Sequence, residues 1–183
     1  MTQIWLVRHG EAAASWEKDP DPGLSALGRE QAERTALMLS DVVPEHARVV
    51  SSPLLRAQQT AAAFAAKRDQ EVIIDLRFSE VRSPVPLSGR KVWLQDFMRQ
   101  RWSEQSDDLW SWRSDIILGL RDVMQPTVIF CHFLVINAVV AEITEKTDVL
   151  QIYPANASFH ELALDGEMLS LIQLGEQMET RVN

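Results

Sequence analysis

The sequence predicts an α/β protein, a three-layer α/β/α sandwich on a mostly parallel sheet that ends in a C-terminal antiparallel hairpin. Two observations predict this class. Short apolar runs alternate with longer segments of helical periodicity, as in parallel strands that are joined by crossover helices. Near the C-terminus, two further strand-like segments are separated by Asp165-Gly166, a dipeptide that favours a tight hairpin turn.

The first strands and helices follow in order from periodicity and capping residues. Residues 4–7 are a continuous apolar run, as expected of a strand that is buried on both faces. A helix that Ser25 caps is predicted to run to about Ser40, and a second strand is predicted over 48–51. The pair Ser52-Pro53 then predicts the N-cap and first residue of a second helix.

The middle of the chain is less regular. A third strand fits residues 71–75, and residues 83–86, with two prolines, interrupt any helix before an amphipathic one that carries Trp93 and Phe97. The clearest helix follows an Asp107 or Asp108 cap. Its apolar stripe consists of Leu109, Trp112, Ile116, Leu120 and Val123.

The last elements are two buried segments and the hairpin. Pro126 ends the preceding helix, residues 127–131 are predicted to form a buried strand, and a helix follows to Ile143. The hairpin strands are predicted over 158–164 and 168–174.

Length and composition describe one globular domain over residues 1–183, because 46% of the residues are hydrophobic and 24% are charged. The formal net charge of −8 has the wrong sign for a nucleic-acid partner. Cys131 is the single cysteine, which excludes an intramolecular disulfide and suits a reducing cytoplasm. No run approaches the ~18 apolar residues of a membrane span, so a membrane partner is disfavoured.

Basic and imidazole side chains follow three of the predicted strands. Arg8 and His9 follow the first strand, Arg56 lies just after the second, and His132 follows the strand at 127–131. Ligands of open α/β sheets bind beyond the carboxyl ends of the strands, so these four side chains are expected to converge. Guanidinium groups bind phosphate oxygens in a planar, bidentate way, and a helix that begins at Pro53 adds free N–H groups. The pattern predicts a phosphoryl site.

Two other hydrolytic chemistries do not fit the same residues. A histidine between two arginines is a poor ligand for a divalent cation, so no metal and no cofactor is expected. A thiol phosphatase needs Cys-x5-Arg, but the position after Cys131 that should be Arg is Asn137. Cys131 and His132 also point to opposite faces of a strand, which excludes a dyad between them.

Three motifs together resemble one known family. They are Leu6-Val7-Arg8-His9-Gly10-Glu11, the segment Leu24-Ser25-Ala26-Leu27-Gly28-Arg29-Glu30-Gln31-Ala32, and Ser51-Ser52-Pro53-Leu54-Leu55-Arg56-Ala57-Gln58-Gln59-Thr60-Ala61. With a late strand-borne His132, the ordered set is similar to the histidine phosphatase superfamily, also called phosphoglycerate mutase-like. The resemblance is weakest between residues 81 and 126.

The resemblance implies a role for each site residue. His9 would be the nucleophile that becomes phosphorylated, and Arg8, Arg56 and His132 would bind the phosphoryl oxygens. Glu80 matches the acidic residue that protonates the leaving group, although Glu11 or Glu161 could take its place. Ser15 stands where the family has a phosphate-contacting Asn.

The expected activity is hydrolysis of a phosphomonoester, on a small metabolite or a phosphorylated protein residue, through phospho-His9 and without metal. Two alternatives remain: a mutase-type phosphotransferase, and a weakly catalytic member that binds phosphorylated partners. Phe133 and Leu134 favour the second alternative, because the family commonly has glycines after this histidine.

Residues 77–101 carry six basic and two acidic side chains, a local charge of +4. The segment could attract an anionic substrate, form a solvated basic helix face, or rest on a membrane surface. Together with the residues up to about 107, it is expected to act as a short lid.

Overall fold

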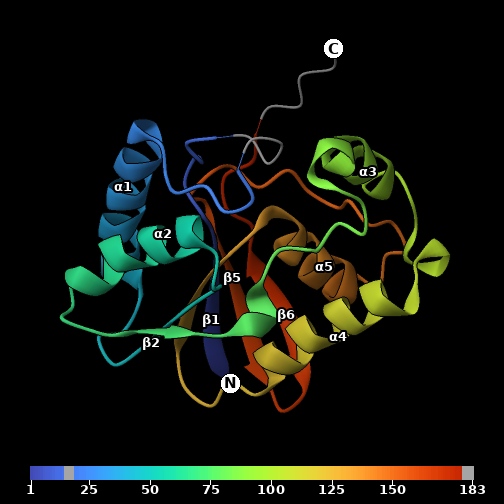
Figure 1. Ribbon diagram of the computed structural model, residues 1–183. Helices are drawn as coiled ribbons and strands as arrows, with labels where there is room; N and C mark the ends of the chain where they lie inside the picture. Colours follow the sequence, from blue (N-terminus) through green and yellow to red (C-terminus); the bar gives the residue numbers. More distant parts are fainter. Residues whose placement is uncertain (15–18, 179–183) are drawn as a thin grey trace.

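The computed structural model describes residues 1–14 and 19–178 (Figure 1). Its strands are β1 (Thr2–Arg8), β2 (Arg48–Ser51), β3 (Val72–Ile74), β4 (Thr127–Cys131), β5 (Phe159–Asp165) and β6 (Met168–Gln173). Its α-helices are α1 (Ala26–Val42), α2 (Leu55–Ala66), α3 (Arg90–Phe97), α4 (Asp107–Arg121) and α5 (Phe133–Thr144). Short 3-10 turns lie at Leu76–Phe78, Leu87–Gly89 and Trp102–Glu104.

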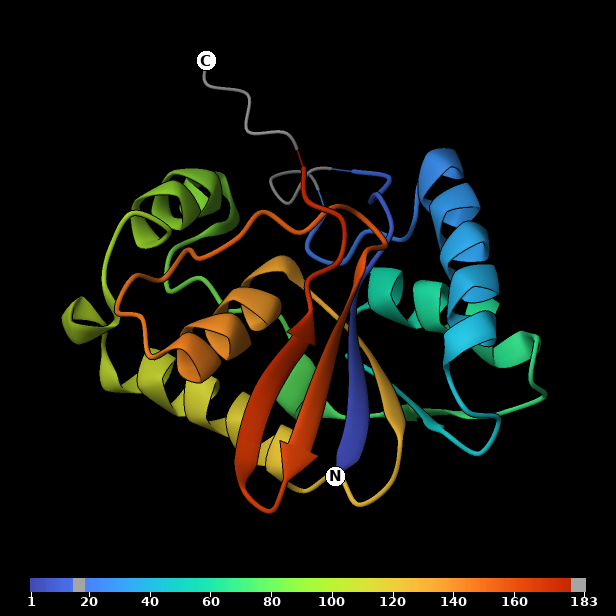
Figure 2. The same cartoon turned by 180° about the vertical axis from the view of Figure 1, so that it is seen from behind.

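The six strands form one sheet in the order β3-β2-β4-β1-β5-β6. The first four are parallel, whereas β5 runs antiparallel to β1 and forms the C-terminal hairpin with β6 (Figure 2). The three-layer sandwich predicted from the sequence is thereby confirmed. The carboxyl ends of β1, β2 and β4, which are neighbours, lie at one edge of the sheet, and this edge carries the polar residues that follow them.

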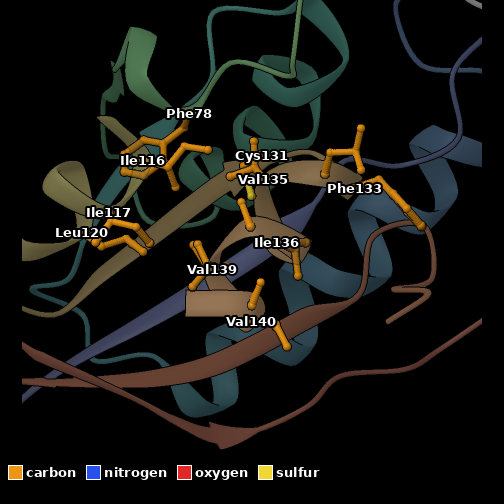
Figure 3. Packing of buried hydrophobic residues seen from close by; sticks show 14 of the residues in the cluster. Phe78, Ile116, Ile117, Leu120, Cys131, Phe133, Val135, Ile136, Val139 and Val140 are labelled. Atoms are coloured by element: carbon orange, nitrogen blue, oxygen red, sulfur yellow. The ribbon is translucent and has the colours of Figure 1, made fainter. Parts of the chain in front are cut away.

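Alternating side chains divide the core between the two faces of the sheet. On β4, Val128 and Phe130 pack toward α1 and α2, whereas Ile129 and Cys131 pack toward α4 and α5. Figure 3 shows the second face, where Ile116, Ile117 and Leu120 of α4 belong to the same buried cluster as the nearly all-apolar helix α5. Because β4 is buried along its whole length, its C-terminal end is held rigidly under the site that follows.

Two helix starts differ from the sequence prediction. Ser52 and Pro53 were expected to begin α2, but the helix begins at Leu55. The Ser52 hydroxyl accepts from the Leu54 N–H and also contacts a histidine of the site, so it is used in a turn rather than in a helix cap. The N-cap of α4 is Ser106 and not Asp107 or Asp108. The two aspartates lie in the first turn of the helix, where their carboxylates interact favourably with the positive end of the helix dipole.

Within the described residues, no helix is both long and apolar enough to cross a membrane.

The buried side chain of His160, on β5, binds the backbone just after β6. The Nδ1 of His160 accepts a hydrogen bond from the N–H of Gly175 at 3.1 Å, and its Nε2 lies 3.3 Å from the hydroxyl of Ser158. Burial lowers the pKa of His160 to about 4. Its ring is therefore neutral in the folded protein at pH values where an unfolded histidine takes up a proton.

Stability should fall as the pH decreases from about 6.5 to 4, because only the unfolded chain binds a proton at this position, at roughly 1.4 kcal/mol per pH unit. His160→Gln keeps an acceptor for Gly175 but does not titrate. Urea unfolding at pH 7 and pH 5 should show that wild type loses about 2 kcal/mol more than this variant. Equal losses would exclude the linkage.

Candidate active site

The carboxyl ends of β1, β2 and β4 bring together the four basic side chains that the sequence predicts to converge. Arg8 is the last residue of β1 and His9 follows it, Arg56 lies in the first turn of α2, and His132 immediately precedes α5. The rings of His9 and His132 lie 5.1 Å apart, and the Nε of Arg56 is 3.1 Å from the Nε2 of His9. The first, second and fourth strands thus build one compact cationic site.

The backbone around His9 fixes the orientation and the protonation of its ring. Its Nδ1 lies 2.7 Å from the carbonyl oxygen of Gly10, which can only accept, so Nδ1 carries the proton and Nε2 keeps its lone pair. The N–H of Gly10 donates to the Thr60 hydroxyl. A Cβ on Gly10 would lie 2.5 Å from the carbonyl oxygen of Gly28, which explains why a small residue follows the histidine.

Burial and neighbouring charge keep His9 neutral. The side chain is almost fully buried, and its pKa lies well below the ordinary value because of desolvation, with further lowering by the cations of Arg56 and Arg8. A neutral imidazole with a free Nε2 lone pair is a competent nucleophile at neutral pH. Its hydrogen-bond partner at Nε2 is the Nε–H of the Arg56 guanidinium.

The two arginines present cationic groups that the protein satisfies only in part. Arg56 is 1% exposed; its Nη1 has no hydrogen-bond partner and lies 3.8 Å from the carboxylate of Asp21. Arg8 donates from Nη1 to the carbonyl oxygen of Pro154, but its buried Nε has no partner. Burial, opposed in part by Glu80, lowers the pKa of Arg8 to about 10, and burial also lowers that of Arg56. A bound dianion would compensate the free-energy cost of burying these two cations.

His132 is completely buried beside His9. Its Nε2 lies 2.7 Å from the hydroxyl of Ser52, while its Nδ1 has no partner. Its pKa is well below the ordinary value, first because of burial and then because of His9, Arg56 and Arg8. In the neutral tautomer whose Nε2 accepts from the Ser52 hydroxyl, the orphaned Nδ1 carries the ring proton and can donate it to a phosphoryl oxygen.

Glu80 lies in the same cluster and is held by two backbone N–H groups. Its Oε1 accepts from Val81 at 3.0 Å and its Oε2 from Leu134 at 3.2 Å. Burial raises the pKa of Glu80, against the opposing effect of these hydrogen bonds and of Arg56 and Arg8. A carboxyl group whose protonated form is favoured by burial is suited to donate a proton.

The other two carboxylates considered from the sequence are used elsewhere. Glu11 accepts from the hydroxyl of Ser25, the N-cap of α1, and Glu161 accepts from the amide of Gln3. Of the three carboxylates, Glu80 is the one that affects the pKa of Arg8 and Arg56.

The bulky pair after His132 has structural roles in the site. The guanidinium carbon of Arg8 lies over the ring of Phe133, 5.2 Å from the ring centroid. The backbone N–H of Leu134 donates a hydrogen bond to the Glu80 carboxyl group. The replacement of small residues by Phe133 and Leu134 is therefore compatible with an assembled site.

Three residues complete the comparison with the sequence prediction. Ser15 lies outside the described residues. Ser52 was predicted as a helix cap, and its contact with His132 could not be read from a local pattern. Arg90 was counted only in the basic segment, but its charge lowers the pKa of Arg56 and His132, so it lies close to the site.

Several basic side chains of residues 77–101 form ion pairs with carboxylates of the protein. Arg77 forms ion pairs with Asp75 and Asp122 at 2.7 and 2.6 Å, and Arg99 and Arg101 also face carboxylates. Arg82 and Arg90, by contrast, line a hollow of about 330 Å³ beside Glu80. Arg82 and Arg90 are thus placed to meet an anionic ligand beside Glu80.

Metal-binding geometry is not present in the parts of the chain that the structure describes, where no three His, Cys, Asp or Glu side chains are grouped to hold an ion.

The family model of the histidine phosphatase superfamily (branch 1) matches residues 4–177 of the chain. The chain is 34% identical over 85 residues to the mitochondrial serine/threonine-protein phosphatase Pgam5 of Drosophila ananassae, covering 45% of this chain and 29% of that protein. It is 28% identical over 156 residues to human 6-phosphofructo-2-kinase/fructose-2,6-bisphosphatase 4, covering 78% of this chain and 33% of that protein. The chain thus spans about a third of the length of these curated relatives.

A solved structure shows the same fold over nearly the whole chain. The phosphoserine phosphatase of Entamoeba histolytica, in complex with 3-phosphoglyceric acid, superposes with a TM-score of 0.74 and 20% sequence identity. The match covers 98% of both chains.

Proposed function

The chain belongs to the histidine phosphatase superfamily, and on this premise we propose that it hydrolyses a phosphomonoester through a phosphohistidine on His9, without a metal ion. The observation that carries the proposal is the state of the His9 ring. Its Nδ1 proton is donated to Gly10, and its Nε2 faces the guanidinium of Arg56.

In the first step, the Nε2 lone pair of His9 attacks phosphorus and the bond to the leaving oxygen breaks. Glu80 donates its proton to that oxygen, so the alcohol leaves uncharged and Glu80 becomes a carboxylate. Arg8 and Arg56 stabilise the equatorial phosphoryl oxygens, as phosphoryl transfer requires mainly alignment and charge stabilisation. The second step reverses these roles: Glu80 takes a proton from water, the water oxygen bonds to phosphorus, and the P–N bond breaks.

The two guanidinium groups supply the positive charge that a divalent cation supplies in other phosphoryl-transfer sites. This supports metal-independent turnover. The substrate class is either a small phosphorylated metabolite or a phosphorylated protein residue. Both classes occur among the names of the relatives, which include a serine/threonine-protein phosphatase and a fructose-2,6-bisphosphatase.

A labelled phosphomonoester, mixed rapidly with the enzyme in EDTA and denatured in alkali, tests the proposal. The protein should retain the label and lose it in acid, as a phosphoramidate does, and inorganic phosphate should accumulate. A mutase would instead pass the label to a second hydroxyl group. A weakly catalytic binding protein would bind the ester without forming either product.

Glu80→Gln tests the general acid. It keeps the hydrogen-bond acceptor for one backbone N–H but cannot donate the proton, so kcat for an alkyl phosphate should fall by about 10² to 10⁴. p-Nitrophenyl phosphate, whose leaving group needs no proton, should lose much less in the phosphorylation step. Equal losses for both esters would show that Glu80 acts only through structure.

A further inference from the structure

We propose that the pocket lined by Trp112 binds the alcohol part of the substrate, and that the preferred alcohol is uncharged and contains a ring. This inference rests on the proposed phosphatase function, because it assigns the group bonded to the leaving oxygen. We call this hollow the Trp112 pocket. It has a volume of about 480 Å³, and its lining includes Leu76, Glu80, Arg82, Ser106, Asp108, Leu109 and Trp112.

The position of Glu80 connects the Trp112 pocket with the reaction. Glu80 lines the pocket and its carboxyl group also affects the pKa of both site arginines, so it lies between the phosphoryl site and the pocket. A general acid must lie within hydrogen-bond reach of the leaving oxygen. The alcohol attached to this oxygen therefore begins at Glu80 and extends into adjacent space.

Trp112 is held in place in the wall of its pocket by a hydrogen bond and by ring stacking. The indole Nε1 of Trp112 donates to the carbonyl oxygen of Ser79 at 3.0 Å, and its ring stacks on the buried Trp102 with an angle of 22° between planes. Leu76 is 74% exposed although it is large and apolar, and it lines the same pocket together with Leu109. A preformed aromatic and aliphatic wall favours a flat apolar ligand, because little ordering is needed on binding.

The charges around the pocket favour an uncharged alcohol. Apart from Glu80, its ionisable lining consists of Arg82 and Asp108, whose charges cancel. A second hollow of about 330 Å³ shares residues 79–83 and contains Arg90, but lacks the tryptophan. An alcohol with a further anionic group would suit that second hollow, whereas a neutral ring suits the Trp112 pocket, whose wall includes Leu109 and Trp112 of α4.

The test compares 2-naphthylmethyl phosphate with ethyl phosphate, two esters of primary alcohols that differ chiefly in the ring. Wild type should have a KM at least about 10-fold lower for the naphthyl ester. Ser106→Trp should fill the pocket and remove this preference, raising KM for the naphthyl ester alone. Ser106 is exposed and makes no side-chain cap hydrogen bond, so the substitution removes no contact from α4.

Three variants keep the result interpretable. Ser111→Trp places the same side chain at an exposed position of α4 outside the pocket and should leave the preference intact. Leu76→Ala removes one apolar wall and should raise the naphthyl KM about 3-fold. Val85→Trp blocks only the hollow with Arg90. If Val85→Trp removes the preference and Ser106→Trp does not, the alcohol lies in that hollow and the inference is wrong.

The two levels of the proposal fail in different ways. If wild type hydrolyses both esters with equal KM, the assignment of the Trp112 pocket is overturned and the phosphatase function stands. If neither ester is hydrolysed and no phosphoenzyme forms from either, the proposed function fails together with the pocket.

Discussion

His9→Ala is expected to abolish turnover of any phosphomonoester in the presence of EDTA, and to abolish the acid-labile phosphoenzyme. The substitution removes the only side chain in the proposed route that forms a bond to phosphorus. The side chains of Arg8, Arg56 and Glu80 stay in place, so the variant should still bind inorganic phosphate. Steady-state hydrolysis and phosphate binding by calorimetry measure the two properties separately.

The matched control is His46→Ala, since His46 is exposed and lies in the loop before β2, at the opposite end of that strand. This variant should keep wild-type turnover. Hydrolysis by His9→Ala at a rate close to that of wild type, whether or not EDTA is present, would contradict the phosphohistidine mechanism. The expected result also separates catalysis from the alternative of a protein that only binds phosphorylated partners.

Arg56→Met should have opposite effects on activity and on stability. Loss of the guanidinium removes a charge from the transition state and the hydrogen bond to His9, so kcat/KM should fall by about 10³ or more. The ligand-free protein should nevertheless become more stable. Arg56 is buried, its pKa is lowered first by burial, and its nearest carboxylate, Asp21, is 3.8 Å away and half-exposed.

Denaturant unfolding should show a gain of about 1 kcal/mol for Arg56→Met, since an apolar side chain of similar length no longer needs solvation. Inorganic phosphate should then stabilise wild type strongly and the variant little, because ligand binding shifts the unfolding equilibrium only where the site is intact. A variant that is less stable than wild type without phosphate would show that Glu80 and Asp21 compensate the buried charge. Lys67, whose ion pair with Glu33 is on the surface, offers a control: Lys67→Met should change stability and activity little.

Much of the fold could be predicted because hydrophobic periodicity is a local property. The strands at 48–51 and 127–131 and the hairpin around Gly166 agree with the structure, since each is specified by its own apolar run or turn residues. Helix starts were less predictable. Ser52 has the residue type of an N-cap, but its hydroxyl is used by His132, a partner 80 residues away.

The sequence by itself determined the α/β class, the order of the elements and the set of side chains that meet at the sheet edge. Local patterns suffice for this, because a strand places whatever follows it at its carboxyl end. Only the tertiary structure decided which of those groups have partners. The orphaned Nδ1 of His132, the Nε2 of His9 that faces Arg56, and the ring of Phe133 under Arg8 depend on contacts between distant segments. Burial, which sets the pKa of these groups, exists only once the chain has folded around them.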